Sequence, residues 1–261
     1  MGRDLHFAVT EDAEANQPSP QIRGPQEAGP QEAEPARSAW GITARDLPPL
    51  PDDAGTNPVG ARLDPRQWFP KPELPFEIEI GSGKGTFLVQ QAEVNPGVNY
   101  LGIEWAGEFY RHAVDRCERR GLQNVRLLYA DAVEFLRFRV PDGVVRTIHL
   151  YFSDPWPKKR HHKNRVVQDK FLADAARVLP EGGLLRIVTD HEDYWAWMEE
   201  YFARWTAPQD GKPAVYERLT YEPVASAGAQ ELVGSNFERK YRREGRPFHA
   251  AVLKRLGGSR A

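Results

Sequence analysis

From Phe76 onward, short apolar runs alternate with segments in which apolar residues recur every three or four positions. The runs are FEIEI (76–80), YLGIE (100–104), VRLLYA (125–130), TIHLYF (147–152) and LLRIVTD (184–190). The segments between them, such as AGEFYRHAVDRCERRG (106–121), have helical spacing. This alternation predicts an α/β fold in which helices cover both faces of a mostly parallel sheet. AVYERLTYEP (214–223) and PFHAAVLKR (247–255) predict an antiparallel C-terminal pair that brings the sheet to seven strands.

The first 70 residues have a different composition. They hold 11 of the 22 prolines, and PQEAGPQEAEPA (25–36) is close to low complexity. Such a segment buries too little apolar surface to offset the entropy lost on ordering. We therefore expect residues 1–70 to be disordered or extended and residues 71–261 to form one domain. Trp68 and Phe69 are expected to pack on that domain.

Overall charge and cysteine content exclude several classes of protein. The net charge is −2 and Cys117 is the only cysteine, so an internal disulfide or a cysteine metal cluster is excluded. His161 and His162 lack the spaced partners of a metal site, and no metal is expected.

Neither an apolar run of 18 residues nor a secretory signal is present, so a cytosolic protein is expected. Any nucleic-acid-binding surface must be local; the basic segments 154–165 and 238–246 are candidates, although a solvated face is the simpler interpretation of each alone.

The first predicted strand ends in a glycine-rich loop, EIGSGKG. Ligands of open parallel sheets bind at the carboxyl ends of the strands. Gly81, Gly83 and Gly85 allow a tight turn and close approach of a ligand to the backbone. A kinase phosphate loop would need glycine where Ile78 stands, and a dinucleotide fold would need G-x-G-x-x-G rather than G-x-G-x-G. Glycine spacing therefore does not identify the ligand.

Three acidic residues stand at the ends of successive predicted strands. Glu104 ends the second strand, where a carboxylate can accept hydrogen bonds from the ribose of either NAD or S-adenosylmethionine (AdoMet). Glu79 suits an ammonium group better than a pyrophosphate, and Asp131 can accept from an adenine amine, so together the three acids favour AdoMet. Each acid could instead be a surface residue or a helix N-cap, Asp131 in particular for a helix beginning at Ala132.

The fourth predicted strand runs into SDPWPKKRHHKNR (153–165). Pro155 and Pro157 fix φ and remove backbone donors, so the loop presents Asp154 and Trp156 rigidly. The indole could stack on a flat base or be buried against the domain. The basic residues that follow favour the first alternative, because phosphates need cations beside a base pocket.

In this order, the motifs resemble those of the bacterial tRNA (guanine-N7-)-methyltransferases, a family with the Rossmann-like class I AdoMet-dependent methyltransferase fold. The resemblance covers about Phe76 to Leu256. It rests on EIGSGKG, GIE (102–104), DAVEFL, FSDPWPKKRHHKNR, VTDHEDY and SNFERKYRREGRPFHAAVLKR, of which the stretch from Asp154 to Arg165 is the most specific. The resemblance implies AdoMet as cofactor, tRNA as partner, and methyl transfer to N7 of a guanine, with the variable loop as its location.

Matching residues imply individual roles. Asp154 would be the active-site acid, between AdoMet and guanine. Cofactor contacts are expected for Glu79, Gly81, Gly83, Glu104, Asp131 and Asp154. Substrate contacts are expected for Lys158, Asp190, Ser235, Asn236, Phe237 and Glu238. RNA contacts are expected for Arg160, His161, His162, Lys163, Asn164 and Arg165. The family pattern has threonine where Ser235 stands, a change that keeps the hydroxyl and loses the methyl group.

The chemistry of guanine N7 sets the role expected of the acid. N7 carries a lone pair and no proton, so its methylation needs no general base. Asp154 is therefore expected to orient guanine and to stabilise the positive charge that develops on it. N7 lies in the deep groove of an A-form helix, so the target base should be unstacked. The alternatives are methylation of an exocyclic amine of another RNA base and a non-catalytic RNA-binding module with this fold. We expect a monomer or a weak homodimer.

Overall fold

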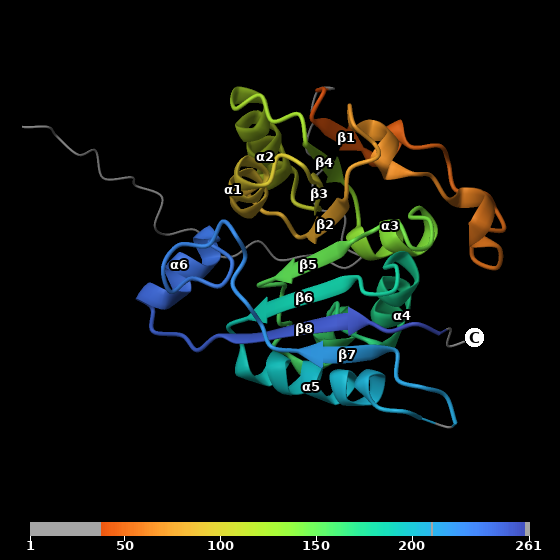
Figure 1. Cartoon of the computed structure of the whole chain (residues 1–261), viewed down its shortest axis with the longest axis vertical. Coiled ribbons are helices and arrows are strands. Elements are labelled where there is room, and N and C mark those ends of the chain that lie inside the picture. Colours follow the sequence, from red (N-terminus) through yellow and green to blue (C-terminus); the bar gives the residue numbers. More distant parts are fainter. Residues whose placement is uncertain (1–37, 210, 259–261) are drawn as a thin grey trace, which may run out of the picture.

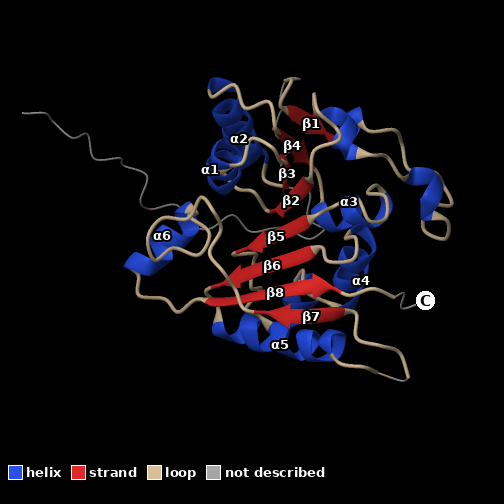
Figure 2. Cartoon of the chain, viewed as in Figure 1, coloured by secondary structure: helices blue, strands red, loops and turns tan. Residues whose placement is uncertain are grey.

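The computed structural model describes residues 38–209 and 211–258, and its core is one eight-stranded sheet in the order β1-β4-β3-β2-β5-β6-β8-β7 (Figure 1). The strands are β1 (Gly41–Thr43), β2 (Phe76–Ile80), β3 (Asn99–Glu104), β4 (Val125–Tyr129), β5 (Thr147–Tyr151), β6 (Leu184–Thr189), β7 (Tyr216–Leu219) and β8 (His249–Arg255). The helices are α1 (Thr86–Val94), α2 (Gly107–Arg119), α3 (Ala132–Phe138), α4 (Asp169–Val178), α5 (Glu192–Thr206) and α6 (Asn236–Arg243). Helices lie against both faces of the sheet (Figure 2).

The predicted mostly parallel sheet is confirmed. All neighbouring strands from β1 to β6 are parallel, and β8 is antiparallel to both β6 and β7. The parallel strands β2 to β6 lie within one residue of their expected bounds, because strands covered on both faces are short apolar runs that stand out in a sequence. The connection between β7 and β8 contains α6. None of the helices in the described ranges has the length and apolar character that a membrane crossing requires.

Residues 38–70 differ from the disordered or extended segment that composition predicted. β1 pairs with β4 and adds an eighth strand to the sheet. The Trp40 indole donates a hydrogen bond to the carbonyl of Leu122 at 2.6 Å. Phe69 is buried and Trp68 packs against the same core, so the predicted packing of these two residues is confirmed. A few aromatic anchors thus fold a proline-rich stretch onto the domain; residues 1–37 lie outside the described residues.

Strand β2 sends apolar and acidic side chains to opposite faces of the sheet. Because side chains alternate along a strand, Ile78 faces the core formed with α3, α4 and α5. Glu77 points to the other face, where its carboxylate contacts His149 at 2.8 Å and also pairs with Arg146. Burial would raise the pKa of Glu77, but hydrogen bonds from His149 and Arg146 outweigh it and lower that pKa to about 2. Glu77 is therefore an ionised acid with a structural role, held by His149 and Arg146.

Candidate active site

The carboxyl ends of four neighbouring strands meet at one edge of the sheet. The strand order reverses at β2, which has β3 on one side and β5 on the other. The glycine loop 81–85 follows β2, and the loop 152–158 follows β5. Glu104 ends β3 and Asp190 follows β6 directly. A reversal of this kind is where open α/β sheets bind ligands.

The glycine loop depends on left-handed backbone angles. Gly81, Gly83 and Gly85 have φ values of 74°, 53° and 69°, which side chains disfavour. A Cβ on Gly85 would lie 2.9 Å from the Cβ of Ala113 in α2. The Gly81 amide donates to the carbonyl of Ile103 at 2.8 Å, so the loop is tied to β3.

Glu104 braces the same loop. Its Oε2 accepts a 2.7 Å hydrogen bond from the Gly83 amide, and its Oε1 accepts one of 2.8 Å from the Ala106 amide. The pKa of Glu104 is raised, chiefly by burial. The backbone hydrogen bonds lower this pKa in part, and the negative charge of Asp154 raises it further. Glu104 therefore shapes the glycine loop as well as standing where a ribose contact is expected.

Glu79 has no comparable partner. Only 5% of the residue is exposed, and its Oε2 is buried without a hydrogen-bond partner among the described residues. Burial, and then the charge of Glu104, raise the pKa of Glu79 well above its usual range. An unpartnered buried carboxylate is costly, and a bound cationic donor would relieve that cost. The site therefore fits AdoMet, which carries an ammonium and a sulfonium group.

Asp131 caps a helix, as one interpretation of the sequence held. Its Oδ1 accepts a 2.9 Å hydrogen bond from the Glu134 amide, and α3 begins at Ala132. The cap uses one oxygen of the carboxylate. Contact of Asp131 with adenine stays a prediction.

The loop after β5 places Asp154 half-buried at the edge of the sheet. The Trp156 indole stacks on the His161 imidazole, with ring centroids 5.7 Å apart and an interplanar angle of 7°. Arg160 and Lys163 are exposed, as RNA contacts require, whereas Arg165 is buried. The basic segment is thus divided between surface cations and one internal cation.

Asp190 is held by an arginine that sequence reasoning did not single out. The Arg246 Nη1 donates to Asp190 Oδ2 at 2.7 Å, and only 12% of the Asp190 side chain is exposed. The Arg246 guanidinium also lies 4.2 Å from the ring centroid of Tyr241. The basic segment 238–246 was the available signal, but its spacing does not indicate which cation reaches Asp190.

The segment before α6, residues 224–234, is called the strap here. Ser235 is the N-cap of α6, and its Oγ accepts a 3.1 Å hydrogen bond from the Glu238 amide. Phe237 approaches the glycine loop, since a Cβ on Gly83 would lie 3.6 Å from its ring. Asn236 is exposed. The segment expected to hold guanine therefore lies beside the loop expected to hold the cofactor.

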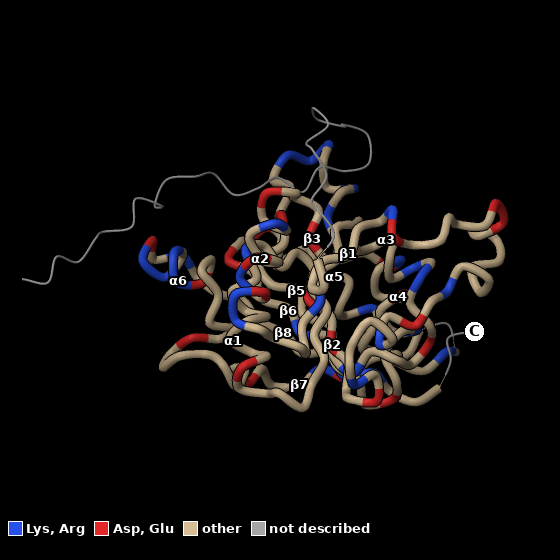
Figure 3. The backbone as a smooth tube through the Cα atoms, turned by 90° about the horizontal axis from the view of Figure 1, so that it is seen from above, with Lys and Arg blue, Asp and Glu red and all other residues tan. Residues whose placement is uncertain are grey.

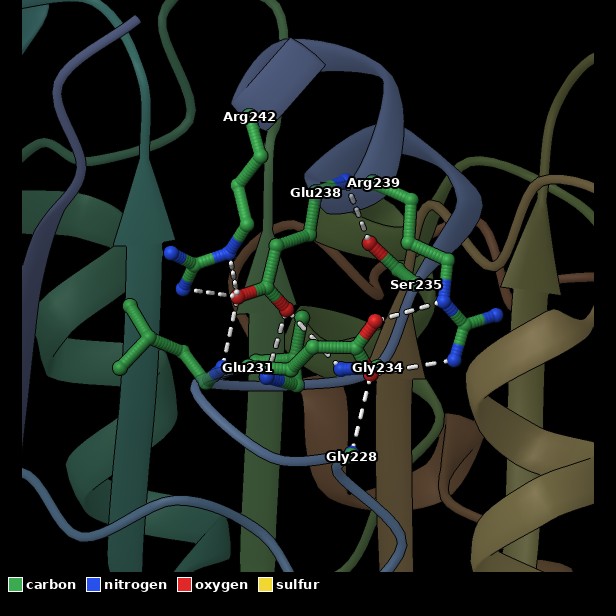
Figure 4. Close-up of polar contacts among 9 residues, drawn as sticks. Gly228, Glu231, Gly234, Ser235, Glu238, Arg239 and Arg242 are labelled. Carbon is green, nitrogen blue, oxygen red and sulfur yellow. Dashed lines mark hydrogen bonds and ion pairs between the residues drawn. The ribbon is translucent and has the colours of Figure 1, made fainter. Parts of the chain in front are cut away.

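Glu238 is occupied by the protein itself (Figure 4). It is fully buried, and its carboxylate accepts hydrogen bonds from three strap amides and from Arg242. The amides belong to Leu232, Val233 and Gly234, at 2.6, 2.9 and 2.9 Å. Glu231 adds further contacts within the strap and to α6. Its carboxylate accepts hydrogen bonds from the Gly228 amide and from Arg239 of α6. In this conformation Glu238 organises the strap, and its contact with guanine stays a prediction.

Replacing Glu238 by alanine should lower the free energy of unfolding by about 3 kcal/mol, because each buried donor left unpaired costs roughly 1–3 kcal/mol. Urea unfolding measures the loss. The matched control is Asp115→Asn, which breaks an exposed pair with Arg119 on α2 and should cost less than about 1 kcal/mol. Equal stability of the two variants would show that Glu238 does not organise the strap.

No cluster of three or more His, Cys, Asp or Glu side chains within residues 38–209 and 211–258 is placed to hold a metal ion. At the strand ends, Glu104 accepts from backbone amides, Asp190 pairs with Arg246, and Glu79 Oε2 has no hydrogen-bond partner within these same ranges.

Comparison with known proteins agrees with this geometry. The fold is that of a Rossmann-like AdoMet-dependent methyltransferase, and a family model described as "Putative methyltransferase" matches residues 73–250. Three curated relatives are each named tRNA (guanine-N(7)-)-methyltransferase. The Rhodospirillum rubrum protein is 35% identical over 70% of this chain and 75% of its own length, and the Acinetobacter baylyi protein is 35% identical over 77% of each. The Alkalilimnicola ehrlichii protein is 43% identical over 52% of this chain, and the match spans 57% of that relative. The chain belongs to the tRNA (guanine-N(7)-)-methyltransferase family.

Proposed function

We propose that this protein transfers the methyl group of AdoMet to N7 of a guanine in tRNA. The observation that carries the proposal is the convergence of Glu79, Glu104 and Asp154 at the reversal of strand order, where one carboxylate oxygen of Glu79 is buried without a hydrogen-bond partner in residues 38–209 and 211–258. Membership of the family supports the same activity, since the relatives from R. rubrum and A. baylyi carry it in their names.

The residues present fit AdoMet. Glu79 would hold its ammonium group, Glu104 its ribose hydroxyls, and Asp131 its adenine amine, with the open backbone at Gly81 allowing close approach. When bound, AdoMet supplies a methyl group activated by attachment to sulfonium sulfur. The chain's own part is to bind, to orient and to compensate charge.

Asp154 acts on the guanine side. Since N7 has a lone pair and no proton, no residue has to act as a base. Methylation leaves the purine positively charged, and a fixed carboxylate at the edge of the sheet stabilises that charge without reorganising. Asp190, held by Arg246, adds a second carboxylate with a fixed position. Both can also accept from the N1 and exocyclic amine of guanine, which favours guanine over adenine.

The exposed cations after Asp154 would bind tRNA phosphates. Figure 3 shows further Lys and Arg on α6, the helix that follows the strap. The Lys158→Gln, Arg160→Gln, Lys163→Gln triple variant should weaken tRNA binding and lower the slope of log Kd against log salt by about 2, because each phosphate contact contributes roughly 0.7–0.9. AdoMet affinity should not change. Lys71→Gln, an exposed lysine before β2, is the control; an unchanged slope in the triple variant would assign these cations to an ordinary solvated face.

The target is proposed to lie in the variable loop of tRNA, and the protein to act in the cytoplasm. The test uses purified protein, AdoMet and unmodified tRNA, followed by borohydride reduction and aniline cleavage at 7-methylguanosine. Cleavage within the variable loop is the expected result. Cleavage elsewhere in tRNA would refute the position, and absence of any cleavage would refute the activity.

A further inference from the structure

The loop that carries Asp154 contains backbone strain. Phe152 and Trp156 have φ values of 53° and 43°, a left-handed region that such residues rarely adopt. Each such residue costs roughly 1–3 kcal/mol and persists only where its surroundings hold it. Something outside the loop must therefore hold residues 152–157 in place.

Arg165 is the side chain that reaches this loop from the far end of the basic segment. Its Nε donates a 2.8 Å hydrogen bond to the carbonyl of Pro155, which lies between Asp154 and Trp156. Its Nη2 forms an ion pair with Asp193 of α5. Only 1% of the Arg165 side chain is exposed. A phosphate group in solution has no access to such a cation.

Helix α5 fixes the guanidinium group. The Arg165 Cζ lies 5.2 Å from the ring centroids of both Tyr194 and Trp197. Both rings are themselves anchored to Val167, because the Trp197 indole donates to its carbonyl at 2.8 Å and the Tyr194 hydroxyl accepts from its amide at 3.3 Å. Planar arginine suits this combination of ring stacking and directed hydrogen bonds, and lysine does not.

Resting on the proposed function, we propose that Arg165 is a positioning residue: it ties the strained loop 152–157 to α5 and so holds Asp154 in its catalytic place, without contacting RNA. This differs from the role expected from the sequence, which grouped Arg165 with the RNA-contacting residues 160–165. The exposed Arg160 and Lys163 keep that role; the buried Arg165 acts through the carbonyl of Pro155.

The test compares Arg165→Lys with Arg160→Gln in methyl transfer to tRNA and in tRNA binding at several salt concentrations. Arg165→Lys keeps the positive charge and loses the planar guanidinium group with its fixed set of hydrogen-bond donors. We expect its kcat at saturating tRNA and AdoMet to fall at least about 10-fold, with the tRNA Kd and its salt slope unchanged, because the loop and not the RNA loses its partner. Arg160→Gln should raise the Kd and lower the slope by roughly 0.7–0.9.

Asp193→Asn keeps the proposal testable if Arg165→Lys does not fold. Asp193 is 62% exposed, so its replacement should leave folding intact, lower kcat less than Arg165→Lys does, and leave the salt slope unchanged. A reduced salt slope in either variant would overturn the positioning role, and so would an undiminished kcat in Arg165→Lys or, where that variant does not fold, in Asp193→Asn. Failure of the wild-type protein to methylate tRNA would instead refute the proposed function, and the wild-type assay reports that outcome separately.

Discussion

Replacing Asp154 by asparagine should lower the kcat of methyl transfer by at least about 100-fold, which is the usual effect of removing one group that stabilises transition-state charge. Asparagine keeps the size of the side chain, removes its charge and replaces one acceptor oxygen by a donor NH2 group. The substrate nitrogen needs no deprotonation, so the whole loss would come from weaker stabilisation of the cationic purine and poorer orientation of guanine. The assay follows methyl incorporation into tRNA at saturating AdoMet and tRNA.

The Asp154 variant should stay folded. The loop backbone is held through the Pro155 carbonyl and by the Phe152 amide, which donates to Val188 at 2.8 Å. The thermal midpoint is therefore expected to move by only a few degrees, the usual scale for a change of about 1 kcal/mol. Asp115→Asn on α2 is the control with unchanged kcat. If the Asp154→Asn enzyme keeps most of its kcat, Asp154 is not the active-site acid.

Glu79→Gln should weaken AdoMet binding by at least about 30-fold, because losing one partner of a buried charge pair costs roughly 2–5 kcal/mol. Glu79 has a raised pKa, and its Oε2 has no hydrogen-bond partner within the part of the chain that the structure describes. A bound cation would stabilise its ionised form. Calorimetry of AdoMet binding measures the change, with Glu108→Gln, an exposed acid of α2, as control.

The raised pKa of Glu79 predicts two trends with pH. AdoMet binding should release a proton, so wild-type affinity should rise with pH until the pH exceeds that pKa; the affinity of Glu79→Gln should lack this rise. The free energy of unfolding of the cofactor-free protein should instead fall as the pH rises. The neutral form is favoured in the folded state, so its contribution is fully present below the ordinary value of 4.5 and is lost as the pH rises through the raised pKa. A wild-type affinity that falls as the pH rises would contradict the assignment of Glu79.

The parallel strands could be predicted from the sequence because each is a short apolar run between polar segments. The predicted position of the site followed from them, since the acids and glycines stand at the ends of those runs or shortly after them. β1 could not be predicted in this way: it is three residues long and lies in a proline-rich segment. Its place depends on pairing with β4, a contact between residues more than 80 positions apart.

The sequence predicted site residues by type and could not assign their partners. Arg165 and Arg160 look alike in a basic segment, and only the packing of Tyr194 and Trp197 shows that Arg165 is internal. Glu238 was expected to contact the substrate, and nothing in the sequence indicated that it is fully buried and holds the strap. These distinctions depend on tertiary contacts, which periodicity and spacing do not encode.

The identity of the methylated nucleoside shows directly whether this protein methylates N7 of guanine in tRNA. Unmodified tRNA is incubated with the protein of residues 1–261 and AdoMet, digested to nucleosides and analysed by mass spectrometry against authentic methylguanosine standards. We expect 7-methylguanosine to form with the wild-type protein and to be absent when Asp154→Asn replaces it. Formation of a guanosine methylated at N1 or at the exocyclic amine, or of no methylated nucleoside at all, would contradict the proposed function.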